Sequence, residues 1–108
     1  MRIEITDVTA RDGLQNERIP VSTIDKIALI RSSAAAGAKR IEVTSFVSPR
    51  AVPQLADAEE VLEGLDLSGN IVLRALVPNM RGAERAAKTR VNEWVCFVSA
   101  TESHSLAN

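Results

Sequence analysis

The 108-residue sequence predicts an α/β fold built on a parallel sheet. Short stretches rich in β-branched residues alternate with stretches whose apolar residues recur at helical spacing, giving the order βαβαβαβ. Strands separated by a helix are joined by right-handed crossovers, which place them parallel to one another. This order fits either an open doubly wound sheet or an arc of a (β/α)8 barrel.

The first strand and helix lie in the N-terminal third. β-branched residues alternate over 3–8 and stop at a polar cluster, residues 9–15, which is typical of a strand that runs into a loop. Ser22 begins a capping-box pattern, and apolar residues then follow at helical spacing until Gly37. We therefore expect a strand over 3–8 and a helix over 23–36.

The same unit then repeats. Residues 40–44 form a compact apolar strand, and residues 46–53 form a loop punctuated by prolines. A second helix ends at Gly64, and its apolar face carries Leu55, Ala58, Val61 and Leu62.

A third copy completes the pattern. Residues 71–77 form a strand, and Asn79 can cap a helix that carries small apolar residues. Residues 94–98 form a continuous apolar strand, in which we expect Cys96 to be a buried small hydrophobe because no base accompanies it.

Polar side chains follow three of these strands, at the carboxyl edge where both candidate architectures place active sites. They are Arg11, Asp12 and Gln15, then Thr44 and Ser45, then Asn79. No loop carries a Gly-x-Gly-x-x-Gly or P-loop motif, so a nucleotide-binding doubly wound fold loses its main support.

Arg11, Asp12 and Gly13 are the first candidates for chemistry. At a strand end, Asp12 could ligate Mg²⁺ or Mn²⁺ while Arg11 holds an anionic group or a developing oxyanion. Gly13 would let the backbone turn sharply and approach a ligand. The alternative is a loop salt bridge with glycine as a turn residue, and spacing alone leaves both open.

Glu42 alternates with Ile41 and Val43, so it points to the opposite face of its strand. In a barrel that face is the interior, where a carboxylate needs a partner, and Arg11 at the neighbouring strand end is the natural one. The alternative is an exposed glutamate at a sheet edge.

Two polar residues near the C-terminus complete the candidates. His104 is the only histidine, cannot make a metal site by itself, and is expected to be an exposed loop residue. Asn108, like Asn79, is either a helix-capping amide or a hydrogen-bond donor to substrate.

Composition excludes several classes of protein. The chain has 13 Lys plus Arg against 14 Asp plus Glu and 3% aromatic residues, so neither charge nor stacking favours nucleic acid. No apolar run is long enough to cross a bilayer, and the N-terminus lacks a signal-peptide pattern. One cysteine cannot form an internal disulfide, and we expect a reducing, cytoplasmic setting.

Five segments carry a family resemblance: RDGLQNE (11–17), IEVTSFVSPR (41–50), VPQLAD (52–57), VPNMRG (77–82) and FVSATESHSLAN (97–108). Together they resemble the hydroxymethylglutaryl-CoA lyase family of metal-dependent lyases and condensing enzymes on a TIM barrel. Isopropylmalate synthase and similar relatives share the Arg-Asp-Gly signature but lack the IEVTSFVSP segment. The resemblance covers essentially the whole chain and identifies residues 1–108 as the N-terminal part of a pyruvate carboxyltransferase-like TIM-barrel domain.

The resemblance implies roles for individual residues. Asp12 matches the metal-ligating aspartate, Arg11 the catalytic arginine that steadies an enolate oxygen, and Glu42 the glutamate paired with them. Positions near the substrate are matched by Arg11 itself and by Gln15, Ser45, Phe46 and Asn108. The implied cofactor is Mg²⁺ or Mn²⁺.

The implied reaction is retro-Claisen cleavage of 3-hydroxy-3-methylglutaryl-CoA, an acyl-CoA, to acetyl-CoA and acetoacetate, as in leucine degradation. Family members commonly read Gly-Pro before the Arg-Asp pair, whereas Thr9 and Ala10 stand here, closer to the condensing relatives. A lyase or condensing relative that acts on another 3-hydroxyacyl-CoA is therefore the alternative.

A TIM barrel takes about 250 residues and eight strands, so this chain is expected to be a half barrel. The family's His-x-His metal ligands and its glycine-rich loop with a catalytic cysteine lie in later strands. We therefore expect the chain alone to have negligible lyase activity. The non-enzymatic alternative is a truncated half barrel whose open edges lead it to self-associate as a homo-oligomer.

Overall fold

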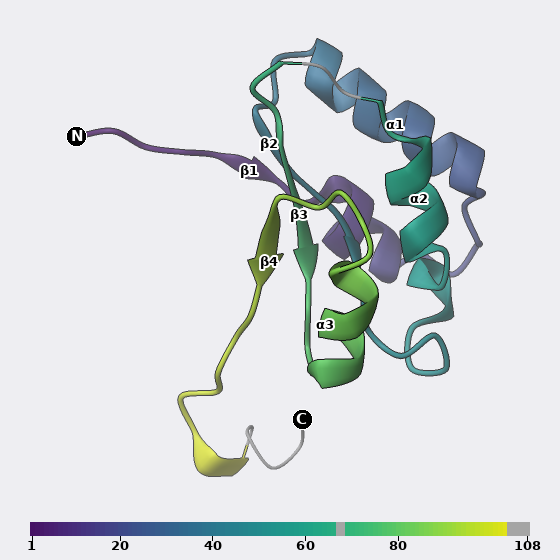
Figure 1. The fold of residues 1–108 in the computed structure, drawn as a ribbon, viewed down its shortest axis with the longest axis vertical. Helices are drawn as coiled ribbons and strands as arrows, with labels where there is room; N and C mark the ends of the chain where they lie inside the picture. Colours follow the sequence, from purple (N-terminus) through teal and green to yellow (C-terminus); the bar gives the residue numbers. More distant parts are fainter. Residues whose placement is uncertain (67–68, 104–108) are drawn as a thin grey trace.

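The computed structural model describes residues 1–66 and 69–103, and its elements follow the predicted order βαβαβαβ (Figure 1). Short helical turns follow β1 and precede α2. The elements are β1 (Thr6–Asp7), a π-helical turn (Thr9–Gly13), α1 (Thr23–Ala35), β2 (Arg40–Ser45), a 3₁₀ turn (Pro53–Leu55), α2 (Ala58–Gly64), β3 (Val72–Leu76), α3 (Met80–Ala86) and β4 (Glu93–Val95).

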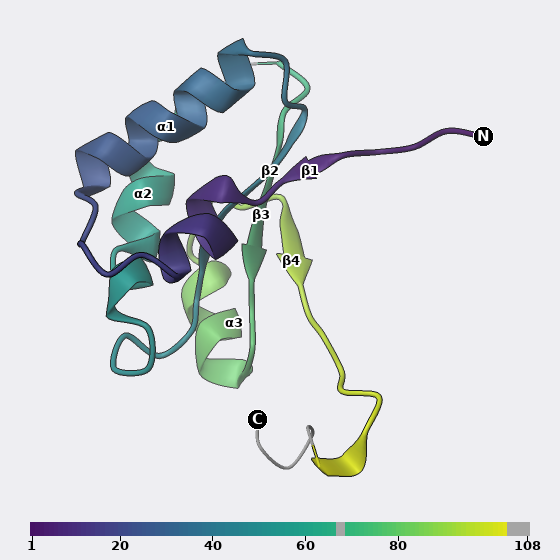
Figure 2. The ribbon, with the colours of Figure 1, turned by 180° about the vertical axis from the view of Figure 1, so that it is seen from behind.

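The four strands form one parallel sheet in the order β1-β2-β3-β4. All three helices lie on the same side of this sheet in both views (Figures 1 and 2). A doubly wound sheet would reverse its strand order at a switch point and carry helices on both faces. Sequential order with one covered face is the arrangement of a barrel arc, so the structure resolves the choice between the two predicted architectures.

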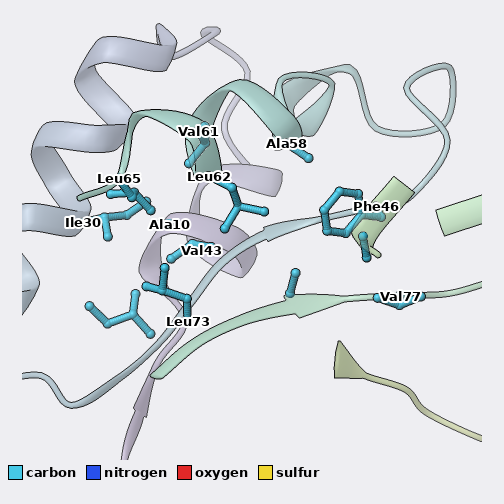
Figure 3. Packing of buried hydrophobic residues seen from close by; sticks show 13 residues of the cluster. Ala10, Ile30, Val43, Phe46, Ala58, Val61, Leu62, Leu65, Leu73 and Val77 are labelled. Carbon is cyan, nitrogen blue, oxygen red and sulfur yellow. The ribbon is translucent and has the colours of Figure 1, made fainter. Parts of the chain in front are cut away.

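The hydrophobic core fills the space between the helices and the sheet (Figure 3). Apolar side chains of β2 and β3 face α1 and α2, which cover them. The largest fully buried apolar side chains are Phe46, Ile30, Ile41, Leu55, Leu62, Val43 and Val61.

The helix boundaries follow the predicted caps. Ser22 Oγ accepts a hydrogen bond from the Asp25 amide at 3.1 Å, and Asn79 Oδ1 accepts one from the Gly82 amide at 2.8 Å. Both side chains satisfy amides that the first turn of a helix leaves without partners. Gly37 follows α1 with φ of 111°, a left-handed conformation that favours glycine after a helix.

An irregularity in β2 decides which side chains face away from the helices. Glu42 lies opposite Arg74, but Thr44 lies opposite the next residue of β3, so Val43 is an extra residue in the ladder. Residues three apart in a regular strand point to opposite faces. Because of this bulge, Glu42 and Ser45 both lie on the sheet face opposite the helices.

The two outer strands are shorter than predicted. The expected strand over 3–8 is only Thr6–Asp7, and the expected strand over 94–98 is Glu93–Val95. Each lies at an edge of the sheet with one neighbouring strand, so the apolar residues beyond these bounds find no pairing. They are exposed, among them Ile3, Ile5, Phe97 and Val98.

Cys96 is likewise exposed, which contradicts its expected burial. It follows the last residue of β4, which is an edge strand. No other element of the described part of the chain lies on the outer side of β4. Its thiol donates only a weak hydrogen bond to the Val77 carbonyl, at 3.6 Å. The apolar run that contains it is an edge segment and not a covered strand.

No helix among residues 1–66 and 69–103 is long and apolar enough to cross a membrane.

A buried ion pair joins α1 to the start of α2. Lys26 is 3% exposed, and its Nζ donates to Asp57 Oδ1 at 2.5 Å and to the Gln54 carbonyl. Burial by itself would raise the pKa of Asp57, but hydrogen bonds from Lys26 and Thr23 outweigh it and lower that pKa below its usual value. Removing one partner of such a pair strongly destabilises the fold, because the other charge then stays buried without a counter-charge.

We predict that Asp57→Asn lowers the free energy of unfolding by about 3 kcal/mol at pH 7, because Lys26 loses its counter-charge. A carboxyl with a depressed folded-state pKa stabilises the fold above its unfolded value of about 4, and this contribution is lost as pH falls through the folded pKa. The difference between wild type and variant should therefore shrink below about pH 4. Urea unfolding at pH 7 and pH 3 measures it.

Asp25→Asn, an exposed change in the first turn of α1, is the matched control and should cost under about 1 kcal/mol. Equal losses in the two variants would contradict the assigned role of the Lys26–Asp57 pair.

Candidate active site

The turn after β1 positions the first two side chains of the candidate site. The Val8 carbonyl accepts hydrogen bonds from the amides of Arg11, Asp12 and Gly13 at 3.2, 2.8 and 3.3 Å, which closes a π-helical turn. Asp7 Oδ1 accepts the Thr9 amide at 2.8 Å, and this bond lowers the pKa of the Asp7 carboxyl. The turn thus places Arg11 and Asp12 at the carboxyl edge of the sheet.

Arg11 and Glu42 form the pair predicted from the sequence. Arg11 Nε donates to Glu42 Oε1 at 2.8 Å, and the two side chains are 18% and 6% exposed. Glu42 projects from β2 on the face opposite the helices, as expected for a barrel interior. The guanidinium is therefore held in one orientation by a buried carboxylate.

Two more predicted residues lie against the same guanidinium. Arg11 Nη1 is 3.3 Å from Asp12 Oδ1 and 3.4 Å from Gln15 Oε1. The Asp12 side chain remains 56% exposed, so its carboxylate is accessible from solvent. The structure thus brings Arg11, Asp12 and Gln15, which follow β1, together with Glu42 of β2.

A hollow of about 900 Å³ opens beside this cluster at the carboxyl edge. Gln15 and Ser45 belong to its lining, together with the segment that follows β2 and the residues around the ends of β3 and β4. Ser45 Oγ accepts the Val47 amide at 3.2 Å, so the hydroxyl also shapes the start of that segment. The hollow is large enough for part of a small organic substrate.

The other predicted residues lie elsewhere. Phe46 is 1% exposed and packs in the core on the helix side, so it is not brought to the Arg11 cluster (Figure 3). Asn108 and His104 lie outside the described residues. Gly13 has no left-handed backbone, and a Cβ there would be 3.6 Å from Thr9 Cγ2, an ordinary contact. Gly13 is the last residue of the π-helical turn that redirects the chain, and this turn does not require a left-handed glycine.

Asp12 is the described residue best suited to a divalent cation. Its carboxylate is a hard oxygen ligand of the kind that Mg²⁺ and Mn²⁺ prefer, and it is accessible. The described part of the chain holds no group of three or more His, Cys, Asp or Glu side chains that could bind a metal ion. Asp12 thus fits as one ligand of a site that needs others.

The sequence interpretation missed a second charged group on the same sheet face. Glu93 of β4 accepts Arg40 Nη2 at 2.5 Å and lies 3.2 Å from Arg74 Nε, and Arg74 Nη1 donates to Thr6 Oγ1 at 3.0 Å. Arg74 stands between apolar neighbours in its strand, as Glu42 does. The same alternation could therefore have identified it.

Known proteins place the chain in a family. The model of the family described as HMGL-like matches residues 2–108. The hydroxymethylglutaryl-CoA lyase YngG of Bacillus subtilis is 43% identical over 107 residues, 99% of this chain and 36% of that protein. A lyase of Pseudomonas aeruginosa, named for 3-hydroxy-3-isohexenylglutaryl-CoA and hydroxymethylglutaryl-CoA, is 42% identical over the same shares.

Comparison with solved structures leads to the same family as comparison of the sequences. The crystal structure of the Bacillus subtilis HMG-CoA lyase superposes with a TM-score of 0.93 over 99% of this chain and 36% of that one. An Acinetobacter baumannii HMG-CoA lyase in complex with coenzyme A and 3-methylmalate gives 0.92 at 44% identity, over 97% of this chain and 34% of that one. The chain spans about a third of the length of these relatives. With a parallel sheet that matches theirs and a family model that covers residues 2–108, the chain belongs to the HMGL-like family.

Proposed function

We propose that this chain contributes the Arg11 half of the active site of a carbon–carbon lyase. The reaction is cleavage of 3-hydroxy-3-methylglutaryl-CoA to acetyl-CoA and acetoacetate. The observation that carries this proposal is the buried hydrogen-bonded pair of Arg11 and Glu42, beside an open hollow at the carboxyl edge. The names of the relatives in the same family support the substrate.

The reaction breaks the bond between C2 and C3 of the substrate. The C3 hydroxyl loses its proton and becomes the ketone of acetoacetate, while the bonding electrons move into the thioester as an enolate. That enolate then takes a proton at C2 and becomes acetyl-CoA. Negative charge therefore develops on the thioester oxygen only as the bond breaks.

Arg11 is the group of this chain that can stabilise that charge. Its Nε is occupied by Glu42, which leaves the Nη side of the guanidinium at the cluster with Asp12 and Gln15. A cation already oriented at the oxygen reorganises little during the reaction, and it stabilises the transition state more than the bound substrate. Glu42 is accordingly a positioning residue that acts through Arg11.

We propose that Asp12 provides one ligand to Mg²⁺ or Mn²⁺. A bound divalent cation lowers the pKa of a hydroxyl that it contacts, which suits deprotonation of a tertiary alcohol. Asp12 Oδ1 lies 3.3 Å from Arg11 Nη1, so Asp12 would hold the cation on the same side of the site as the guanidinium. The remaining ligands would come from outside the described residues.

A second acyl group is a candidate for the substrate. The Pseudomonas aeruginosa relative is named for a branched isohexenyl substrate as well as for hydroxymethylglutaryl-CoA. The hollow beside Ser45 is lined largely by apolar residues, among them Val47, Leu76 and Val98. A larger 3-hydroxyacyl-CoA is therefore the second candidate substrate.

We also propose that the 108-residue chain self-associates when it is isolated. Five of its exposed apolar residues lie at the two edges of the sheet: Ile3 and Ile5 beside β1, and Trp94, Phe97 and Val98 in and after β4. Unpaired strand edges with exposed apolar side chains favour association. A reducing, cytoplasmic setting remains a prediction that rests on the single cysteine.

We predict negligible lyase activity for the isolated chain, because Asp12 alone cannot hold the cation. A chimera in which residues 2–108 replace the matching 36% of the Bacillus subtilis lyase should cleave 3-hydroxy-3-methylglutaryl-CoA. A coupled assay for acetoacetate with added Mg²⁺ measures both. Metal-dependent release of acetoacetate by the isolated chain, or an inactive folded chimera, would contradict the proposal.

In the chimera, Glu42→Gln should lower kcat by about 10²-fold, because the guanidinium loses the charge that orients it. Steady-state kinetics measure this change. Glu60→Gln, the same substitution at an exposed position of α2, is the control and should leave kcat unchanged. A kcat for Glu42→Gln within about threefold of the parent would remove Glu42 from the mechanism.

The isolated chain should elute from a sizing column as a mixture of oligomers whose mass rises with concentration, because the apolar edges are exposed. Size-exclusion chromatography with light scattering measures the mass. A monodisperse monomer across the concentration range would count against self-association.

A further inference from the structure

The segment between β2 and α2 forms one wall of the hollow. Four of its residues, Val47, Ser48, Ala51 and Val52, belong to the lining. Its first two amides bond to the sheet, Phe46 to the Leu76 carbonyl at 2.8 Å and Val47 to Ser45 Oγ at 3.2 Å. The amides of Ala51 and Val52 donate within the segment, to the Ser48 carbonyl at 3.0 and 3.1 Å. A further contact that holds the segment comes from α3.

Arg85 of α3 makes that connection from the helix side of the sheet. Its Nη1 donates to the Val47 carbonyl at 3.3 Å, and its guanidinium carbon lies 5.4 Å from the centroid of the Phe46 ring. These two residues are the first of the segment after β2. Arg85 thus contacts the wall at the point where it leaves the strand.

Glu59 of α2 holds Arg85 in place. Arg85 Nε and Nη2 donate to the two carboxylate oxygens of Glu59 at 2.6 and 2.8 Å, a bidentate pair. The hydrogen bond from Arg85 lowers the pKa of Glu59, and Glu59 raises the pKa of Arg85, so both groups stay charged at neutral pH. All three guanidinium nitrogens are in use, and a lysine could not reproduce this arrangement.

The helix that carries Arg85, α3, also packs closely against the start of the same segment. A Cβ on Gly82 would lie 2.7 Å from the Phe46 carbonyl oxygen, so only glycine allows this approach of α3. Phe46 is therefore fixed from two directions, by the backbone at Gly82 and by the guanidinium of Arg85. The Glu59 side chain is 40% exposed and that of Arg85 27%, so the pair lies at the surface and away from the Arg11 cluster.

We propose that Glu59 and Arg85 are a positioning pair that holds the segment 46–52 as a wall of the acyl-CoA hollow and thereby sets the affinity for the acyl-CoA. The inference rests on the proposed function for the identity of the ligand. It assigns no contact between the pair and the substrate. Loss of the pair should weaken acyl-CoA binding and leave the chemical step intact.

The test compares Glu59→Gln and Arg85→Lys with two matched controls. Glu63→Gln makes the same change one turn later on α2, at an exposed residue. Arg90→Lys alters an arginine whose hydrogen bonds, among residues 1–66 and 69–103, go to the carbonyls of Glu63 and Leu65. Hydrogen exchange of the Ala51 and Val52 amides is followed in the 108-residue chain and in the chimera, and acetyl-CoA binding and lyase kinetics are measured in the chimera.

In both variants the two amides should exchange about fivefold faster, and KM and the acetyl-CoA Kd should rise about fivefold, as expected for the loss of one or two hydrogen bonds. The value of kcat should stay within about twofold, and the controls should match the parent. Unchanged exchange, an unchanged Kd, or the same shifts in the controls would overturn the positioning role. A chimera that binds acetyl-CoA but cleaves nothing would overturn the proposed lyase function and leave the positioning role to be decided by exchange and Kd.

Discussion

The ion pair of Arg11 and Glu42 joins side chains 31 positions apart, and it can form only because β1 and β2 are parallel neighbours. Glu42 is almost fully buried, and a carboxylate in that position is stable only with a partner. The π-helical turn after β1 carries Arg11 and places its guanidinium within hydrogen-bond distance of Glu42. The pairing of the strands, the turn and the polar face of β2 are therefore all needed for this one ion pair.

The bulge at Val43 is the second constraint on the candidate site. It lets Glu42 and Ser45 share the face opposite the helices, while Ile41 and Phe46 both remain in the core. A slip of one residue in β2 would reverse these faces, burying a charge against α2 and exposing the phenyl ring. The local irregularity thus satisfies the core and the polar face at the same time, which a regular strand could not do.

The sequence predicted features that depend on the local residue pattern. It did not predict features that depend on which strands and helices lie side by side in the fold. The helix cap at Ser22 followed from spacing, whereas the cap at Asn79 and the pairing of Glu42 with Arg11 were each one of two interpretations that the sequence left open. The length of the edge strands did not follow from spacing, because an apolar run forms a strand only where another strand lies beside it, and Cys96 is exposed for this reason. The bulge and the contact of Arg85 with Val47 could not be predicted, since both depend on atoms brought together by the folded sheet.

The polar face of the sheet also explains why the arc needs a cover. Glu93 pairs with Arg40 and Arg74, and Arg40 Nη1 also lies 3.7 Å from Glu4 Oε2, so two arginines are matched by two carboxylates. While the face is open to water, solvent screens these charges. A polypeptide that covers the face removes this screening, so the ion pairs then need hydrogen-bond partners from the covering chain. A surface that packs against this face must therefore be polar where it meets Arg40, Arg74 and Glu93.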